Sequence, residues 1–176
     1  MAHPKTKINI GIDLDGVIID KPPIIPQKII EWLYRSHKKR KLEYRFPKKY
    51  EQYVRILSHH PLIRPPINTN IALIRKLAED ERYCVFAVSS RYSFLIKRTK
   101  QWINHYGIND LFEKIYLNEN DDQPHVFKEA MINKLKIDIL IDDDKALVNY
   151  LKRRFKNLRT VVVDKSNNKL KRFVNS

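Results

Sequence analysis

Short apolar runs alternate with longer amphipathic stretches over most of the chain. Five runs predict buried strands because each is brief and mostly apolar; they cover residues 7–13, 83–88, 114–117, 137–141 and 159–163. Between them, apolar residues recur at helical spacing and predict helices around residues 71–78, 93–106, 124–135 and 145–155. The tail after residue 165 is basic and weakly patterned. This alternation predicts an α/β fold, a parallel sheet flanked by helices.

Polar residues stand where several predicted strands end. Asp13 ends the first strand, Ser89 follows the second and Asp142 follows the fourth. Right-handed crossovers bring the carboxyl ends of parallel strands to one edge of a sheet. We therefore expect these side chains to lie together at the carboxyl edge, where open α/β sheets bind ligands.

Residues 21–67 interrupt this alternation, with prolines near both ends of the interruption. Helical patterns occupy residues 27–41 and the residues after Pro47. The second pattern predicts a helix that carries Tyr50, Tyr53, Val54 and Leu57 on one face. The aromatic residues of the insert are Trp32, Tyr34, Tyr44, Phe46, Tyr50 and Tyr53. They form either a small core of the insert or a shelf on which a base stacks.

Length and cysteine content narrow the class of protein. The 176 residues suit one domain of ordinary size with a small insert. No apolar run approaches the ~18 residues that a membrane helix needs, and the N-terminus lacks a secretory apolar region. The single cysteine, Cys84, lies within a predicted strand and excludes an internal disulfide. We expect a cytoplasmic protein without membrane insertion.

The formal net charge of +15 is concentrated in two segments. Residues 21–68 hold twelve Lys and Arg against three acidic residues, and residues 145–176 hold ten against one. Such segments favour polyanions, including phosphates, nucleic acid and acidic membrane surfaces. The alternative is a lysine-rich surface that meets only solvent.

The predicted carboxyl edge is crowded with carboxylates. Asp13, Asp15, Asp142 and Asp143 would repel one another there, and a hard, oxygen-ligated cation such as Mg²⁺ relieves this repulsion. The Ser89 hydroxyl and the backbone N–H groups after it offer donors to a phosphate. A cation, a carboxylate nucleophile and N–H donors together suit phosphoryl transfer. The plain alternative for Asp-Leu-Asp-Gly is a surface turn, because Asp and Gly both favour turns.

Three lysines compete to supply a fixed positive charge at this edge. The helix over 124–135 runs antiparallel to the following strand, so Lys128 in its second turn lies near the carboxyl edge. Lys134 and Lys136 lie at the opposite edge, roughly 15 Å away for five strand residues at ~3.3 Å each. The sequence therefore favours Lys128.

The order of these residues resembles the motifs of the haloacid dehalogenase (HAD) superfamily of phosphatases. DLDGV at 13–17 resembles the first motif, VFAVSS at 85–90 the second, Lys128 the third and ILIDDD at 139–144 the fourth. The resemblance implies a Rossmann-like HAD core formed by residues 1–20 and 68–176. It also implies that residues 21–67 form a small helical type-one cap that closes over the site and selects the substrate.

A finer resemblance lies in residues 89–108, SSRYSFLIKRTKQWINHYGI. This stretch is similar to the 5′-nucleotidase-like branch, in which a strand-ending Ser/Thr-x-Arg leads into a helix that carries Thr-x-x-Trp. It implies that a nucleoside monophosphate is the first substrate to consider.

The superfamily resemblance also implies roles for individual residues. Asp13 would be the nucleophile, Asp15 the general acid and base, Ser89 a donor to the phosphoryl group, and Lys128 its fixed charge. The implied Mg²⁺ ligands are Asp13, the Asp15 carbonyl, Asp142 and Asp143. Gly16, Ser90 and Arg91 are the candidate phosphate-binding residues, although Ser90 also suits a helix cap and Arg91 a surface or cap contact. Asp144 fits a structural N-cap.

Three functions follow from these observations. The first is a Mg²⁺-dependent phosphomonoester hydrolase acting on a nucleoside monophosphate or another small phosphorylated metabolite. The second is removal of end phosphates from nucleic acid, which the basic insert and tail favour. The third is a non-catalytic protein that binds RNA or other anions on a HAD scaffold.

Overall fold

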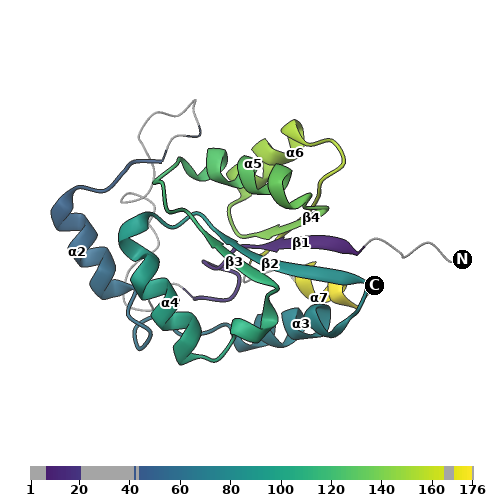
Figure 1. Cartoon of the computed structure of the whole chain (residues 1–176), viewed down its shortest axis with the longest axis horizontal. Helices are drawn as coiled ribbons and strands as arrows, with labels where there is room; N and C mark the ends of the chain where they lie inside the picture. The colour runs from purple at the N-terminus through teal and green to yellow at the C-terminus, as the bar shows by residue number, and fades with distance from the viewer. Residues whose placement is uncertain (1–6, 21–41, 43, 165–168, 176) are drawn as a thin grey trace, which may run out of the picture.

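The computed structural model describes residues 7–20, 42, 44–164 and 169–175. The described residues form a five-stranded parallel sheet with the strand order β3-β2-β1-β4-β5 (Figure 1). The strands are β1 (Ile8–Ile12), β2 (Tyr83–Ser89), β3 (Lys114–Leu117), β4 (Ile139–Asp142) and β5 (Arg159–Val162). All five predicted strands are present, and the predicted α/β fold with a parallel sheet is confirmed.

Helices cover both faces of this sheet. The helices of the described residues are α2 (Lys49–Ser58), α3 (Asn68–Glu79), α4 (Ile96–His105), α5 (Pro124–Leu135), α6 (Lys145–Arg154) and α7 (Lys169–Val174), with short 3₁₀ turns at Ser93–Leu95 and Asn109–Leu111. Figure 1 shows α5 and α6 on one face, and α3 and α7 on the other. Within the described part of the chain, each helix is too short or too polar to cross a bilayer.

The central strands supply both layers of the core. Successive side chains of a strand point to opposite faces, and β4 shows this directly. Ile139 and Ile141 join the cluster on the α3 side, whereas Leu140 packs in the cluster on the α5 and α6 side. Each of the three is at most 1% exposed, and burying one such side chain contributes about 1.5–3 kcal/mol. The strand ends that carry the polar residues therefore sit on a rigid base.

The basic tail contains a helix that the sequence pattern does not predict. Leu170 of α7 is 3% exposed, and α7 packs against α3 and β5. A helix of six residues spans less than two turns, so it shows little periodicity, and helices this short depend on tertiary packing. The tail thus covers part of the sheet.

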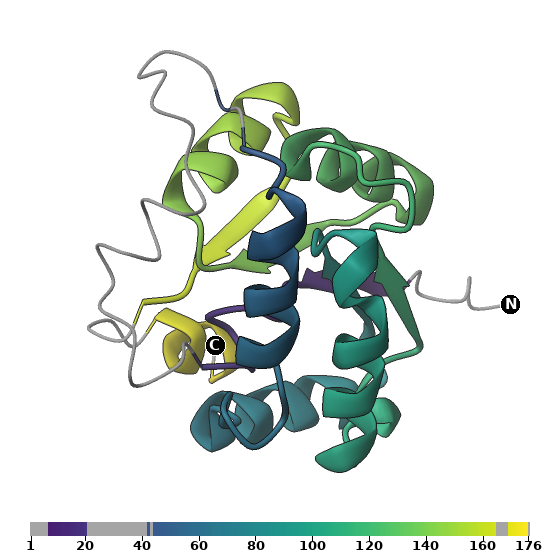
Figure 2. The same cartoon turned by 90° about the vertical axis from the view of Figure 1, so that its left-hand side faces the viewer.

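The insert meets the core at two adjacent strand-like segments. The Asp20 N–H donates to the Pro65 carbonyl at 2.9 Å, and the Ile67 N–H donates to the Ile18 carbonyl at 2.8 Å. From this junction α2 reaches across the carboxyl edge of the sheet, in front of it when the molecule is viewed from that end (Figure 2). The predicted helix over 27–41 lies outside the described residues.

The apolar residues predicted to share one face of α2 are largely exposed. Tyr50, Tyr53, Val54 and Leu57 are 57–70% exposed, whereas the buried side chains of this helix are Glu51 and Arg55. The helix borders a cavity lined by several charged residues instead of packing on an apolar core, and the covered side of the helix is its polar side.

Candidate active site

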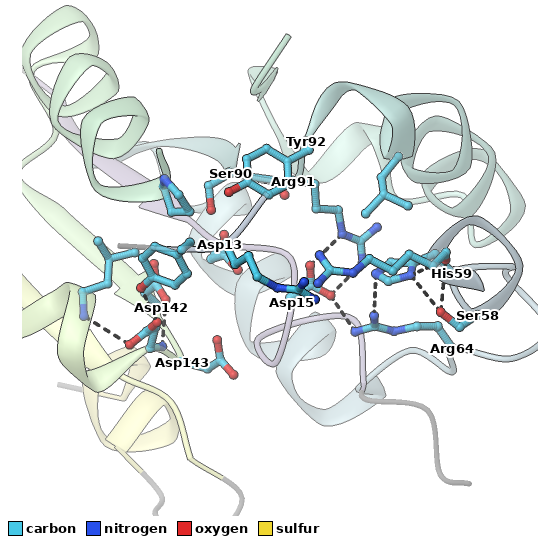
Figure 3. A pocket seen from close by; sticks show the side chains of 18 of the residues that line it. Asp13, Asp15, Ser58, His59, Arg64, Ser90, Arg91, Tyr92, Asp142 and Asp143 are labelled. Atoms are coloured by element: carbon cyan, nitrogen blue, oxygen red, sulfur yellow. Dashed lines mark hydrogen bonds and ion pairs between the residues drawn. The ribbon is translucent and has the colours of Figure 1, made fainter. Parts of the chain in front are cut away.

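A cavity of about 250 Å³ lies between the carboxyl edge of the sheet and α2. Its floor carries Asp13, Ser89 and Asp142 from the ends of three neighbouring strands, and its opposite wall carries Arg55 and Ser58 of α2. Figure 3 shows Asp13, Asp142 and Ser58 converging on the cavity from segments far apart in the sequence. The structure thus brings the strand-end residues together at one cavity, at the predicted edge.

A buried charge cluster occupies one end of this cavity. The Lys128 ammonium donates to Asp13 Oδ1 at 2.7 Å and to Asp142 Oδ2 at 2.9 Å. These residues are 1%, 7% and 2% exposed, respectively. Lys134 and Lys136, the competing lysines, are exposed. We call Asp13, Lys128 and Asp142 the buried triad.

The surroundings of this triad raise the pKa values of two of its members, Asp13 and Lys128. Burial raises the pKa of Asp13 to about 7, and the nearby Asp142 and Asp15 carboxylates add to this shift while Lys128 opposes it. Burial alone would lower the pKa of Lys128, but Asp13 and Asp142 raise it, so this lysine remains an ammonium. The triad therefore holds a fixed positive charge beside a carboxylate that is costly to ionise without a further cation.

The carboxylates of Asp13, Asp142 and Asp143 form a set that fits a hard cation. One oxygen from each lies within 4.8 Å of the others, and carboxylate oxygens are the ligands that Mg²⁺ takes in phosphate chemistry. Gly16 makes room for this set. Its φ of +70° favours glycine, and an added Cβ would overlap the Asp143 side chain. The donor chemistry and this cradle therefore fit the predicted magnesium ion.

Two serines at the end of β2 line the same cavity. Ser89, the last residue of the strand, is 1% exposed, and Ser90 is half-buried. Ser90 is tied in place through its carbonyl, which accepts a hydrogen bond from Asn118 at 3.4 Å. Both serines therefore line the cavity that Asp13 also lines.

Two arginines hold Asp15, and they turn it away from the buried triad (Figure 3). Arg91 donates to Asp15 through Nε at 2.6 Å and Nη2 at 2.7 Å, and Arg64 donates through Nη2 at 2.6 Å. Burial alone would raise the pKa of Asp15, but Arg91 and Arg64 hold it well below its usual range. The candidate acid and base is thus an ionised, doubly paired carboxylate in this arrangement.

Arg64 and His59 take part in this site although the sequence analysis does not single them out. His59 is 3% exposed; its Nδ1 lies 2.6 Å from the Arg55 carbonyl and its Nε2 lies 2.9 Å from Arg64 Nη1. Burial lowers the pKa of His59, and Arg91 and Arg64 lower it further. A neutral ring with the proton on Nδ1 satisfies both contacts, so His59 supports Arg64. Arg64 is one basic residue among twelve in its segment, and no pattern marks it.

Asp144 has the capping role expected for it. Its carboxylate accepts hydrogen bonds from the backbone N–H groups of Ala146 at 2.9 Å and Leu147 at 3.1 Å, which caps α6. Its other oxygen accepts from the Tyr44 hydroxyl at 2.6 Å. Tyr44 of the insert is therefore attached to the core beside the cavity.

The sheet order and the carboxylate-rich edge define the class, a Rossmann-like α/β domain with its site at the carboxyl ends of the strands. Solved structures of HAD-family hydrolases share this fold. The sequence itself matches no family model, and no curated protein matches it.

Three similar structures illustrate the likeness. A HAD-family enzyme from Bacteroides thetaiotaomicron, an aspartate-to-alanine variant in complex with magnesium and inorganic phosphate, has a TM-score of 0.61 at 16% identity, covering 96% of this chain and 99% of that one. A haloacid dehalogenase-like hydrolase from Streptococcus pneumoniae has a TM-score of 0.59 at 14% identity, covering 89% and 84%. A chain of the Pnkp1/Rnl/Hen1 complex has a TM-score of 0.57 at 16% identity; the match covers 93% of this chain and only 47% of that one. At sequence identities this low, the structural likeness shows a shared fold and nothing finer.

Proposed function

We propose that the chain is a Mg²⁺-dependent phosphomonoester hydrolase that works through an aspartyl-phosphate, in a cytoplasmic compartment. The observation that carries this proposal is the buried triad, in which Asp13 and Asp142 line the floor of the cavity and Lys128 donates to both. An Asp13 oxygen attacks phosphorus, the bond from phosphorus to the leaving alcohol breaks, and the alcohol leaves with a proton. Water then attacks the same phosphorus, which releases phosphate and restores the Asp13 carboxylate.

The other residues of the floor would act on charge and position. Lys128 lies within hydrogen-bond reach of Asp13, so its ammonium would hold the nucleophile and neutralise the phosphoryl oxygens as they approach. Ser89 and Ser90 would donate to those oxygens. Positioning and charge neutralisation supply most of the catalysis in phosphoryl transfer, and this set of residues offers both.

Magnesium would be held by Asp13, Asp142 and Asp143, with the Asp15 carbonyl as the fourth protein ligand implied by the resemblance. When bound, it supplies a positive charge that stabilises the ionised carboxylates and the phosphoryl oxygens. The similar Bacteroides enzyme was solved with magnesium and inorganic phosphate, which supports this assignment.

Asp15 would protonate the leaving alcohol and then activate the water, but only after a change of partners. A general acid must carry a proton and must face the reacting group, whereas Asp15 here faces two guanidinium groups. We therefore infer that Asp15 leaves Arg64 and Arg91 during the reaction. The described part of the insert, residues 44–67, borders the cavity, which supports a role for residues 21–67 as a cap.

The test is hydrolysis of a panel of nucleoside monophosphates, sugar phosphates and phosphorylated oligonucleotides with and without Mg²⁺. Asp13→Asn should lower turnover by at least about 10³-fold, as expected for a nucleophile, while its melting temperature stays within a few degrees of the parent. Asp110→Asn, which alters an exposed carboxylate paired with Arg75, is the matched control and should retain activity. Full activity of Asp13→Asn would refute the proposal. Preference for nucleoside monophosphates would support the 5′-nucleotidase-like branch.

A second candidate function, removal of end phosphates from nucleic acid, is supported by the charge of +15 and by the likeness to a chain of an RNA repair complex. It predicts that phosphorylated oligonucleotides are better substrates than mononucleotides, and that this advantage falls steeply between low and moderate salt. Equal hydrolysis of mononucleotides at both salt concentrations argues for the small substrate. Tight RNA binding without activity on the whole panel would instead favour the non-catalytic alternative.

A further inference from the structure

Arg64 and Arg91 form a paired guanidinium site at the end of the cavity opposite the buried triad. Each is buried, with 6% and 5% of its side chain exposed, whereas 32% of the Asp15 side chain that they hold is exposed. They come from different segments, the insert and the loop after β2. Figure 3 shows the acidic cluster and this basic pair on opposite sides of the cavity.

Contacts that do not involve Asp15 fix both arginines. Arg91 Nη1 donates to Thr99 Oγ1 at 3.0 Å, and Thr99 in turn donates to the Leu95 carbonyl. Arg64 Nε donates to the Asp20 carbonyl at 2.8 Å, and Arg64 Nη1 donates to His59. The guanidinium groups would therefore keep their positions if Asp15 turned away, and such a preorganised site binds an anion with little ordering cost.

The contacts to Asp15 have the geometry that guanidinium groups use for anions in general. Arg91 makes a bidentate pair and Arg64 adds a third hydrogen bond; carboxylates and phosphates both accept such forks. Arg55 also lines the cavity, and its positive charge adds to that of the two arginines, which favours a second negative charge. Asp15 occupies the position that an external anion would take.

We propose that Arg64 and Arg91 bind a second anionic group of the substrate, a carboxylate or phosphate on the leaving-alcohol side, in place of the Asp15 carboxylate. This inference rests on the proposed function. The displaced Asp15 side chain then turns toward the phosphoryl group at Asp13, so the substrate itself completes the site. The substrate class is a phosphomonoester with two anionic groups.

Pairs of substrates that differ in the second anion test this on the unmodified chain. One pair is 3-phosphoglycerate and glycerol 3-phosphate; the other is a nucleoside 3′,5′-bisphosphate and the matching 5′-monophosphate. We expect kcat/KM to be roughly 10- to 100-fold higher for the two-anion member of at least one pair. This is the factor that one or two additional hydrogen bonds to charged groups contribute. The pair that responds identifies the anion as carboxylate or phosphate, and a 5′-phosphorylated dinucleotide shows whether a bridging phosphate suffices.

Variants assign the effect to the paired arginines. Arg64→Gln should reduce the preference to within about threefold, mainly through a higher KM for the two-anion substrate, and Arg64→Lys should retain part of it. Arg75→Gln, which breaks an exposed pair with Asp110 outside the cavity, removes the same charge and should keep the full preference. If Arg64→Gln melts much lower than the parent, Arg91→Gln replaces it. Binding of both substrates to the Asp13→Asn chain by calorimetry gives a readout without turnover.

The outcomes separate this inference from the proposed function. Equal kcat/KM within both pairs, with Asp13-dependent hydrolysis intact, overturns the second-anion site and leaves the phosphatase assignment standing. A preference that survives both Arg64→Gln and Arg91→Gln also overturns it. Absence of Asp13-dependent hydrolysis across the whole panel overturns both.

Discussion

Lys128→Met is a substitution whose consequences can be worked out from the contacts of the buried triad. Methionine fills much of the same buried space but removes an ammonium that lies 2.7 Å from Asp13 and 2.9 Å from Asp142. The two carboxylates then share a site with almost no solvent contact. Removing one partner of a buried ion pair costs about 3–5 kcal/mol because the remaining charge is uncompensated.

That free energy converts into a large change in melting temperature. A domain of this size shifts by about 2–4 °C per kcal/mol, so Lys128→Met should melt about 6–20 °C below the parent, in chelator at pH 8. Lys134→Met is the matched control, since Lys134 lies on the same helix but is exposed and contacts only the face of Tyr116 among the interactions described. It should change the free energy of unfolding by no more than about 0.5 kcal/mol.

Two further measurements test the electrostatic cause. Mg²⁺ should return part of the lost stability, because a cation neutralises the same carboxylates. The deficit should also shrink at pH 5, where Asp13, with its pKa raised to about 7, is protonated in the folded state. If Lys128→Met melts within about 2 °C of the parent in chelator at pH 8, the reasoning about the triad is refuted.

The remaining predictions concern the magnesium ligands. In Gly16→Ala, the new Cβ would displace the Asp143 side chain. The Mg²⁺ concentration for half-maximal activity should therefore rise by about tenfold or more, which is the usual effect of disturbing the residues around a metal ligand. An unchanged Mg²⁺ dependence would contradict this. The folded pKa of Asp13 is raised above the unfolded value of 3.8, so the contribution of Asp13 to stability is lost as pH rises from about 4 to about 7. Mg²⁺ binds the ionised form of Asp13, so adding Mg²⁺ should raise the melting temperature more at pH 8 than at pH 5. Scanning fluorimetry measures this rise. An equal rise at both pH values would count against Asp13 as a ligand.

Local patterns predict the core of the fold because short buried strands and amphipathic helices are properties of neighbouring residues. The parallel topology then follows from the alternation, and with it the meeting of Asp13 and Asp142 at one edge. The closeness of Lys128 to Asp13 and Asp142 follows from the direction of α5, which runs antiparallel to β4 and begins near the carboxyl edge. Their catalytic and metal-binding roles stay predictions that the experiments above address.

The partners of Asp15 could not be predicted in the same way. Arg64 lies forty-nine residues from Asp15 along the chain, in a segment with many other basic residues, and its position depends on how the insert returns to the core. Trp102 contributes to that position by donating its indole N–H to the Arg64 carbonyl at 2.7 Å. No spacing in the sequence predicts such a contact, because it depends on how α4 packs against the loop that carries Arg64.

The orientation of α2 shows that helical periodicity alone does not tell which side of a helix is covered. An apolar stripe points inward when the helix packs on an apolar core, but α2 borders a cavity rich in charged groups. Its buried Glu51 is satisfied by Arg45 and by the Lys48 N–H, and burial without such partners would be costly. Where a helix walls a polar cavity, the covered side is the one whose polar groups find partners, and the apolar side is left to face outward.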